Sequence, residues 1–478
     1  MSNKLYAGVA WTDITSKEPG ANDTLRAKVL ALQYDDKKYA LVSVDYICLG
    51  GGIGILRDDV FDVLKAEAKS LGVDTFLCGM THTHTHGEMI VRQEELVEKI
   101  KCAIKEAFEN LKPAKVGSST GINTEFAINR TLKLKDGSYW SIRQAHPCPP
   151  DDEIDENPYA DYTVGVIKVE GENGENICTV FTYGCHPLLG FANNRATSNY
   201  PGIAEKLIES EVGGMAMMFQ SCGGDVTEID YKNYDKPKSA QKVGESLGLT
   251  VLEVLKNIKA ESSEIRDSIR EVAFPRKKDI KEVMDNLVKE REHLLAYMAD
   301  CPLNFKAFLP LYMKYLMNPE YPLGYKYEYM KEEEQGISQL TDQDKINRAN
   351  IERYLSNIKI MERLSKICST LYTMSWHDKY NASYDYKDVD SEVLGIRMGD
   401  ALLLSAPVEP VSETGRRIRA LSPLEKTFVV GYANGYMHYG SPEELYENGG
   451  YETIECMLSK DWYKIYEGAL KEIFEDLK

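Results

Sequence analysis

The segment Thr75-Phe76-Leu77-Cys78-Gly79-Met80-Thr81-His82-Thr83-His84-Thr85-His86-Gly87-Glu88 joins a largely apolar run to three histidines that alternate with threonines. The whole chain of 478 residues contains only eight histidines. Because side chains alternate between the faces of an extended strand, His82, His84 and His86 would share one face. A row of imidazoles at a strand end predicts a metal or acid–base site, and a solvated polar strand end is the simpler alternative.

Two conformations of this segment give different arrangements of the histidines. In a helix, His82 and His86 would lie at positions i and i+4 of one face, an arrangement that resembles that of metalloproteases. In a strand, all three imidazoles would line up. We expect the extended form, because β-branched threonines favour strands and Gly87 ends the run.

The composition excludes several classes of protein. With 57 basic and 75 acidic residues the chain has a net charge of −18, which argues against binding to nucleic acid or to anionic membrane surfaces and favours a small-molecule substrate. We find no run of about eighteen apolar residues and no secretory signal, so we expect no stable membrane insertion. The ten cysteines form no CxxC pair, which is typical of a cytoplasmic protein with free thiols.

Strand-like and helical patterns alternate along most of the chain and predict an α/β fold, with mixed β-sheets flanked by helices. We interpret residues 1–478 as a single catalytic domain. The expected strands are 26–34 and 39–45, joined as a hairpin, then 163–170, 177–183, 215–219, 393–398, 401–404 and 427–432. The expected helices include 92–112, one that starts near Gly202, and 412–421.

The middle of the chain, residues 275–370, has a different character and predicts a helical insertion within that domain. Apolar residues at helical spacing mark two long helices around an aromatic-rich segment that prolines interrupt. The insertion would serve as a lid, as one wall of a pocket, as packing against the parent domain, or as a contact in a homo-oligomer.

Polar residues follow the predicted strands at four places, where functional side chains commonly lie. They are His82 with His84, His186, Asp225 with Thr227, and Glu409 with Tyr436 and Tyr439. Together with Ala7-Gly8-Val9-Ala10-Trp11-Thr12-Asp13-Ile14-Thr15 near the start and Glu443-Glu444-Leu445-Tyr446 near the end, these segments resemble the catalytic domain of the neutral/alkaline, non-lysosomal ceramidases. That family consists of zinc-dependent amidases, so the resemblance implies Zn²⁺ as cofactor.

The resemblance also implies a set of zinc ligands. Thr81-His82-Thr83-His84-Thr85 matches the family segment that supplies the first zinc histidine, and His186-Pro187 matches the segment of the second. Pro407-Val408-Glu409 matches the carboxylate segment, and Asn434-Gly435-Tyr436-Met437-His438-Tyr439 matches the tyrosine segment. The implied ligands are His82, His186, Glu409 and Tyr439.

Other residues receive catalytic or substrate-binding roles. The chemistry of such a site suggests that His84 would move a proton and that Arg130 would steady a developing oxyanion, and Tyr436 is a further catalytic candidate. Thr227 stands where the family carries a serine proposed to act in catalysis, so it keeps a hydroxyl but adds a methyl group. The substrate-binding residues would be Asn129, His86 and Asp225.

These features predict a zinc-dependent hydrolase that cleaves an amide (N-acyl) or ester bond of a soluble, hydroxylated small molecule through a zinc-activated water. The family's C-terminal immunoglobulin-like domain has no counterpart here, which makes membrane ceramide a weak candidate substrate. Three alternatives stay open: a metal-dependent carbohydrate-processing hydrolase or lyase, an enzyme with Cys222 as nucleophile, and a non-catalytic binding protein.

Overall fold

The computed structural model describes residues 4–17, 20–84, 90–141, 148–156, 158–190, 193, 195–228 and 239–478. The chain divides into two compact units. The first comprises Met1–Lys277 and Tyr380–Lys478, and the second comprises Lys278–Lys379. No helix of the described ranges combines the length and the apolar character needed to cross a membrane.

The larger sheet of the first unit has eight strands, antiparallel except for two parallel pairs, β3–β4 and β11–β12. In spatial order they are β12 (Met215–Gln220), β11 (Asn176–Tyr183), β10 (Thr163–Gly171), β5 (Lys112–Ile122), β1 (Leu5–Asp13), β2 (Arg26–Tyr34), β3 (Lys37–Val44) and β4 (Thr75–Met80). The hairpin expected from the polar turn near Asp35 is confirmed as β2–β3, and Asp35 takes the positive φ that such a turn favours.

A second sheet of four strands packs against the first. Its order is β14 (Ile265–Phe274), β15 (Val389–Met398), β16 (Ala401–Ser405) and β18 (Lys426–Val430). Leu32, Leu41 and Phe219 of the larger sheet share one buried cluster with Leu394 and Phe428 of the smaller one. The apolar face of each sheet is therefore covered by the other.

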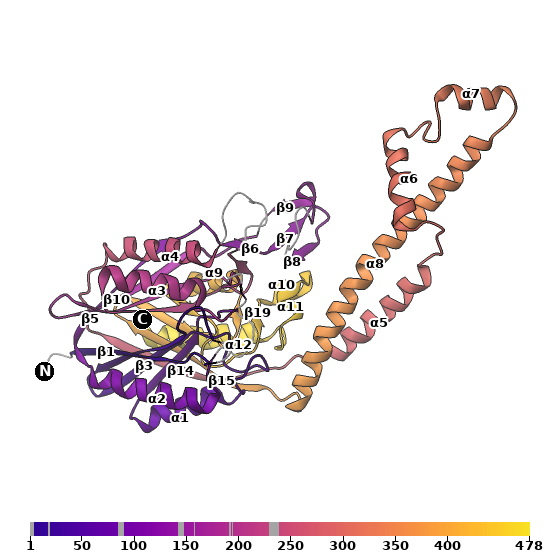
Figure 1. Ribbon diagram of the computed structural model, residues 1–478. Coiled ribbons are helices and arrows are strands. Elements are labelled where there is room, and N and C mark those ends of the chain that lie inside the picture. Colours follow the sequence, from indigo (N-terminus) through magenta and orange to yellow (C-terminus); the bar gives the residue numbers. More distant parts are fainter. Residues whose placement is uncertain are drawn as a thin grey trace. The chain divides into compact units, whose positions relative to one another are not determined.

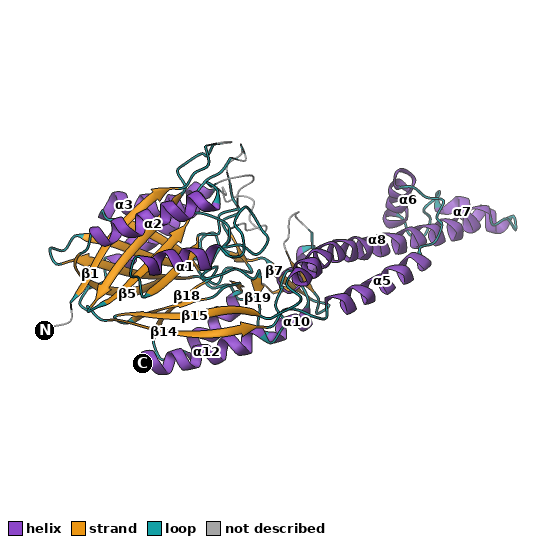
Figure 2. Ribbon diagram, turned by 90° about the horizontal axis from the view of Figure 1, so that it is seen from below, coloured by secondary structure: helices purple, strands orange, loops and turns teal. Residues whose placement is uncertain are grey.

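Helices cover the outer faces of both sheets, as Figures 1 and 2 show. The larger sheet is covered by α1 (Val60–Ser70), α2 (Gln93–Glu109), α3 (Asn199–Val212) and α4 (Ala240–Leu255). The smaller sheet is covered by α12 (Trp462–Leu477), with α9 (Ser412–Leu421) beside it. The first unit thus has four layers, helix–sheet–sheet–helix, which confirms the predicted α/β class with mixed sheets flanked by helices.

Several short elements lie beyond the ends of the main strands. Two-residue strands form the pairs β6 (Ile128–Asn129) with β13 (Val226–Thr227), and β17 (Glu409–Pro410) with β19 (Tyr439–Gly440). A small sheet contains β7 (Thr131–Leu134), β8 (Tyr139–Ser141) and β9 (Ile154–Glu156), and the short helices are α10 (Glu443–Asn448) and α11 (Tyr451–Ile454). These elements carry Asn129, Thr227, Glu409 and Tyr439 of the residues expected at the site.

The second unit is helical and falls where the insertion at 275–370 was expected, although its bounds are Lys278–Lys379. Its helices are α5 (Ile280–Tyr297), α6 (Phe305–Met317), α7 (Lys326–Glu334) and α8 (Gln339–Ser383). The unit has its own small core around Phe308, Tyr315 and Ile351. Within it the buried Asp344 accepts hydrogen bonds from Tyr315 and Tyr329, which joins the aromatic-rich segment to α8.

Candidate metal centre

The ends of several strands bring the expected ligands together. His82 follows β4 and His186 follows β11, both at the carboxyl end of a strand that pairs in parallel with a neighbour. Glu409 and Tyr439 are direct partners in the parallel pair β17–β19. Residues 82, 186, 409 and 439 of the chain therefore meet at one end of the sheets, where α/β proteins commonly place their ligands.

The histidine segment does not continue β4 as an extended strand. His82 has φ of 61°, because its backbone N–H turns to donate to the Tyr46 carbonyl at 3.0 Å. A non-glycine residue rarely adopts this conformation, and such strain is common at functional sites. The expected alternation is therefore wrong for His82, but the rings of His82 and His84 still lie edge to face, 4.5 Å apart. His86 lies outside the described residues.

Backbone carbonyls fix the orientation of two imidazoles. Nδ1 of His82 lies 2.7 Å from the Ile47 carbonyl, and Nδ1 of His186 lies 2.6 Å from the Gly223 carbonyl. Nδ1 therefore carries the proton in both rings, and both Nε2 lone pairs are available to a metal. Gly223 is required for this approach, since a Cβ there would stand 2.7 Å from the Cys185 backbone nitrogen.

The oxygen atoms of the cluster stand at distances that suit a tetrahedral ion. Oε2 of Glu409 lies 3.1 Å from Nε2 of His186 and 3.5 Å from Nε2 of His82, and the Tyr439 hydroxyl lies 3.4 Å from Nε2 of His186. Zinc bonds of about 2.0–2.1 Å in a tetrahedron separate neighbouring ligand atoms by about 3.3 Å. The residues present therefore fit the expected zinc ion.

The protonation states also suit a cation. Burial lowers the pKa of His82 to about 4, and burial together with the neighbouring His82 holds the pKa of His84 well below its usual range. Burial opposes ionisation of Glu409, but the adjacent histidines outweigh burial and hold its pKa well below the usual value. At neutral pH His82 and His84 are thus neutral imidazoles beside one carboxylate, and zinc binds both kinds of donor.

His84 is the third nitrogen donor of the cluster. Its Nε2 lies 2.9 Å from Nε2 of His82, and its ring centroid lies 5.6 Å from that of His186. The reactive nitrogens of all three histidines lie within 4.8 Å of one another. His84 is also the least buried of the three, which places it beside the ligands on the side nearer to solvent.

Tyrosines surround the carboxylate of Glu409. Tyr436 donates a short hydrogen bond to Oε1, and the Tyr432 hydroxyl lies 3.4 Å from Oε2. Tyr436 therefore contacts the expected carboxylate ligand. The sequence reasoning missed Tyr432, whose ring also packs 4.1 Å from that of His82. It was counted as the last residue of a strand, but β18 ends at Val430 and Tyr432 has φ of 55°.

Arg130 is a buried cation that contacts Tyr439, the tyrosine expected to bind the metal. Its guanidinium donates to the Tyr439 hydroxyl at 2.9 Å, to the Gly224 carbonyl at 2.7 Å and to Glu452 at 2.9 Å. Burial opposes its charge, but Tyr439 and Glu452 raise the pKa of Arg130 well above its usual value. Sequence patterns held no signal for Glu452 or for Tyr451, because both lie outside the motifs. The Tyr451 ring lies 5.2 Å from the guanidinium.

Asn129 and Asp225 form part of the wall rather than of the histidine cluster. The β6–β13 pair brings them together, and Asn129 donates to Asp225 at 2.8 Å. The other oxygen of Asp225 accepts from the Ser412 backbone at 2.7 Å and from its hydroxyl at 2.8 Å. Burial raises the pKa of Asp225 to about 6, an effect that these hydrogen bonds oppose.

Thr227 is buried, and its backbone pairs with that of His186 in an isolated β-bridge. Its hydroxyl donates to Glu228 at 3.2 Å. Cys222 is fully buried in the cluster beneath α9 and α12, and burial raises the pKa of its thiol. A buried, protonated thiol is a poor nucleophile, which argues against the cysteine alternative.

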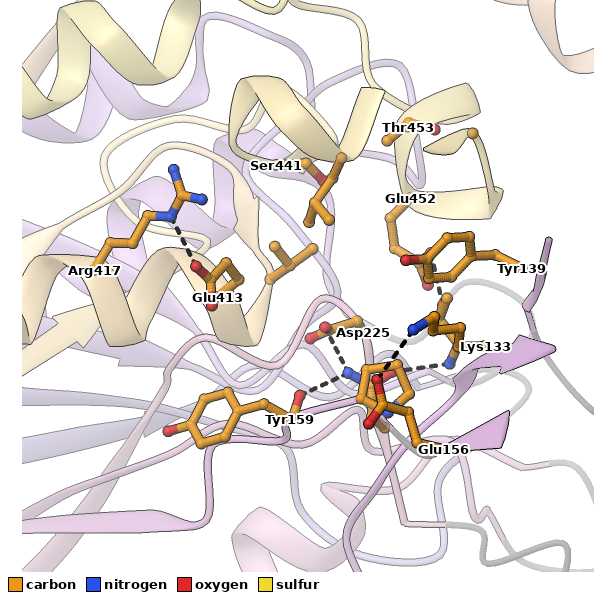
Figure 3. Close-up of a pocket in the computed structure, with 16 residues that line it drawn as sticks. Lys133, Tyr139, Glu156, Tyr159, Asp225, Glu413, Arg417, Ser441, Glu452 and Thr453 are labelled. Carbon is orange, nitrogen blue, oxygen red and sulfur yellow. Dashed lines mark hydrogen bonds and ion pairs between the residues drawn. The ribbon is translucent and has the colours of Figure 1, made fainter. Parts of the chain in front are cut away.

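A cavity of about 250 Å³ is lined by both chain neighbours of Arg130, Asn129 and Thr131. Figure 3 shows it between the three-stranded sheet, α9 and the α10–α11 segment. Asn129, Asp225 and Glu452 belong to its wall, and Glu452 also holds Arg130. The cavity is therefore linked to the cluster through Glu452, which lines the cavity and accepts from Arg130, the residue that donates to Tyr439.

Comparison with known proteins supports the fold directly. No family model and no curated protein sequence matches the chain. A crystal structure of neutral ceramidase from Pseudomonas aeruginosa matches with a TM-score of 0.61, and a ceramidase complexed with C2 matches with a TM-score of 0.62. Each match covers 100% of this chain and 75% of the other, at 14% sequence identity. The resemblance read from the motifs is thus confirmed, and the chain has the fold of the neutral ceramidases.

Proposed function

We propose that this protein is a zinc-dependent hydrolase that cleaves an amide or ester bond of a hydroxylated small molecule. The observation that carries the proposal is the convergence of His82, His186 and Glu409 at zinc-ligand spacing, with the Tyr439 hydroxyl beside them. The ceramidase fold supports it, because the solved relatives named above are ceramidases.

Each polar group at the centre has a chemical task in such a reaction. Zinc, when bound, supplies a Lewis acid that polarises a carbonyl and lowers the pKa of water. His84 is neutral at pH 7, so its Nε2 accepts a proton from the attacking water and then returns it to the leaving group. Arg130 is a permanent cation in a buried setting, and it stabilises negative charge that develops on a substrate oxygen near Tyr439.

Two other residues position this machinery. Tyr436 donates to Glu409 and so holds the carboxylate in one orientation. Asn129 and Asp225 fix the segment that carries Arg130, since the Arg130 backbone N–H donates to the Asp225 carbonyl at 2.8 Å. A carbohydrate-processing hydrolase or lyase is the second candidate, favoured by the polar cavity beside Arg130.

Metal content measured by mass spectrometry on the purified protein tests the proposal. We expect one zinc ion per chain. His186→Ala and Glu409→Ala should each weaken zinc binding by more than about 100-fold, because loss of a ligand lowers metal affinity more than loss of a residue that hydrogen-bonds the ligand. Both variants should keep their circular dichroism spectrum and lose hydrolysis of N-acyl and ester substrates.

The matched control is His293→Ala, which removes an exposed histidine of α5 and should retain zinc and activity. A wild-type protein that stays metal-free after zinc is supplied would contradict the proposal. Full zinc loading without hydrolysis of amides or esters would instead direct the search to glycosidic substrates.

A further inference from the structure

We propose that the cavity beside Arg130 binds an uncharged, polyhydroxylated ligand of the size of one sugar ring. The cavity lies in the first unit and is built from β7–β9, α9 and the α10–α11 segment (Figure 3). This site is separate from the histidine cluster, and its existence does not depend on the proposed hydrolase activity.

The size of the cavity favours a single small ring. Its volume of about 250 Å³ lies just below the range of about 300–1,000 Å³ that is typical of small-molecule pockets. Val411 and Leu445 supply apolar surface, and the Tyr139 ring stands at the wall. Apolar patches and an aromatic ring suit the C–H faces of a sugar, whereas its edges need hydrogen-bonding groups.

The charges of the wall exclude most charged ligands. Four carboxylates, Glu156, Asp225, Glu413 and Glu452, face two cations, Lys133 and Arg417. Both cations are already engaged: Lys133 lies 3.6 Å from Glu156, and Arg417 donates to Glu413 at 2.8 Å. Glu452 is likewise paired, with Arg130 at 2.9 Å. The excess of negative charge opposes an anion, and because three of the four carboxylates already have a cation beside them, the attraction for an amine is weak.

The same carboxylates suit hydroxyl groups. A carboxylate offers about four lone-pair positions, and a hydrogen bond or ion pair to the protein uses only part of that capacity. Hydroxyls of Thr131 and Thr453 add further polar contacts along the wall. A ligand with several hydroxyl donors on one ring satisfies this pattern without bringing a charge into the cavity.

Ser441 provides an independent observation that points to a ligand. It lines the cavity and is fully buried, and its hydroxyl finds no hydrogen-bond partner among the described residues. Buried hydroxyls normally have partners, because an unsatisfied one destabilises the fold. A ligand hydroxyl in the cavity would supply the partner that the described residues do not.

A ligand in the cavity would also contact a residue that orients part of the candidate metal centre. Glu452 uses one oxygen to accept from Arg130, at 2.9 Å, and its other oxygen accepts from Thr131 at 3.1 Å. A ligand that binds the Glu452 carboxylate therefore contacts the residue that orients Arg130 toward Tyr439.

Isothermal titration calorimetry with defined probes tests the proposal. The probes are glucose, N-acetylglucosamine and myo-inositol, with inorganic phosphate and ethanolamine as anionic and cationic comparisons. We expect at least one polyol to bind at about 20 mM or below, and neither comparison compound to bind. Because the readout is binding and is repeated on zinc-stripped protein, a negative result leaves the hydrolase proposal standing.

Two variants locate the binding site. Ser441→Ala should weaken polyol binding roughly tenfold while leaving the melting temperature unchanged or raised, since it removes an unsatisfied hydroxyl. Tyr139→Ala, at a partly exposed position, should weaken binding with little effect on folding. The control is Ser43→Ala: Ser43 is equally buried but donates to the Met218 carbonyl, so its loss should lower the melting temperature and leave binding intact.

Three outcomes would overturn the proposal. They are failure of all three polyols to bind, polyol binding that neither Ser441→Ala nor Tyr139→Ala weakens, and binding of phosphate or ethanolamine as tight as that of the polyols.

Discussion

Two clusters of buried polar groups lie in the first unit, and they differ in their balance of donors and acceptors. In the first, Lys28 of β2 lies 2.8 Å from Asp45 and 2.6 Å from Glu205, and Arg26 donates to Glu205 at 3.0 Å. Lys28, Asp45 and Glu205 are fully buried, and the cationic and anionic groups are matched. This ion network joins the larger sheet to α3 and is complete without a ligand.

The second cluster is the histidine–carboxylate centre, where the balance is reversed. Nε2 of His82, Nε2 of His186 and Oε2 of Glu409 all present lone pairs toward one another. Convergent acceptors repel unless a cation or a proton lies between them. The two clusters are both buried, so burial of charge does not distinguish them. The excess of acceptors in the second cluster is the feature that supports the proposed metal site.

Lys28→Met would break the matched ion network and has the largest expected effect. It leaves Asp45 and Glu205 as buried carboxylates without their shared lysine, which should lower the free energy of unfolding by about 3–5 kcal/mol. Urea denaturation measures this loss of unfolding free energy. The control is Lys4→Met, whose partner Glu172 is 3.9 Å away at an exposed position, and which should cost no more than about 1 kcal/mol. Equal losses in the two variants would remove the distinction between the clusters.

Glu228→Gln tests how pH changes the free energy of unfolding when a buried carboxyl group has a raised pKa. Glu228 is fully buried beside Thr227, and burial raises its pKa from 4.5 to about 7, although hydrogen bonds oppose the shift. The folded state therefore holds its proton more tightly than the unfolded state. The resulting stabilisation is complete below pH 4.5 and is lost as pH rises through about 7.

The free energy of unfolding of the wild type, relative to Glu228→Gln, should thus fall by about 3 kcal/mol between those pH values. Urea denaturation at a series of pH values gives this difference. Glu172→Gln, at an exposed position, serves as the control and should show no comparable trend. A difference between wild type and Glu228→Gln that stays constant with pH would contradict the prediction.

Tyr436→Phe tests the surroundings of the histidine–carboxylate centre, and its expected effect is the smallest of these variants. It removes the hydroxyl that donates to Glu409 and keeps the buried ring, so zinc affinity should fall by about 10–100-fold. Competition with a chelator measures the affinity. Tyr463→Phe is the control, because that buried hydroxyl has no partner among the described residues and should leave zinc binding unchanged. Equal zinc affinities of Tyr436→Phe and Tyr463→Phe would count against a zinc site at Glu409.

Much of the fold followed from periodicity and turn chemistry. The helix expected at 412–421 is α9, Ser412–Leu421, and the hairpin strands lie where alternation placed them. The helix expected to start near Gly202 is α3, which starts at Asn199 and so has Pro201 in its first turn. Proline is tolerated in the first turn of a helix, where its missing N–H needs no partner.

The candidate site was less predictable, because its geometry depends on residues far apart in sequence. Motif resemblance brought His82, His186, Glu409 and Tyr439 to attention, and the structure places them together. No local pattern could show that His82 adopts a positive φ, or that Tyr432 and Glu452 contact the centre. Those facts arise from backbone contacts such as His82 with Tyr46, and from the approach of the C-terminal segment.

The pairing of Glu409 with Tyr439 determines when the site can assemble during translation. Chains grow from the N-terminus, so residues 82 and 186 leave the ribosome long before residue 439. A nascent chain with both histidines exposed still lacks the strand that holds its carboxylate. We therefore expect the four groups to come together only after residue 439 has emerged, so that a metal held by all four would report that the β17–β19 pair has formed.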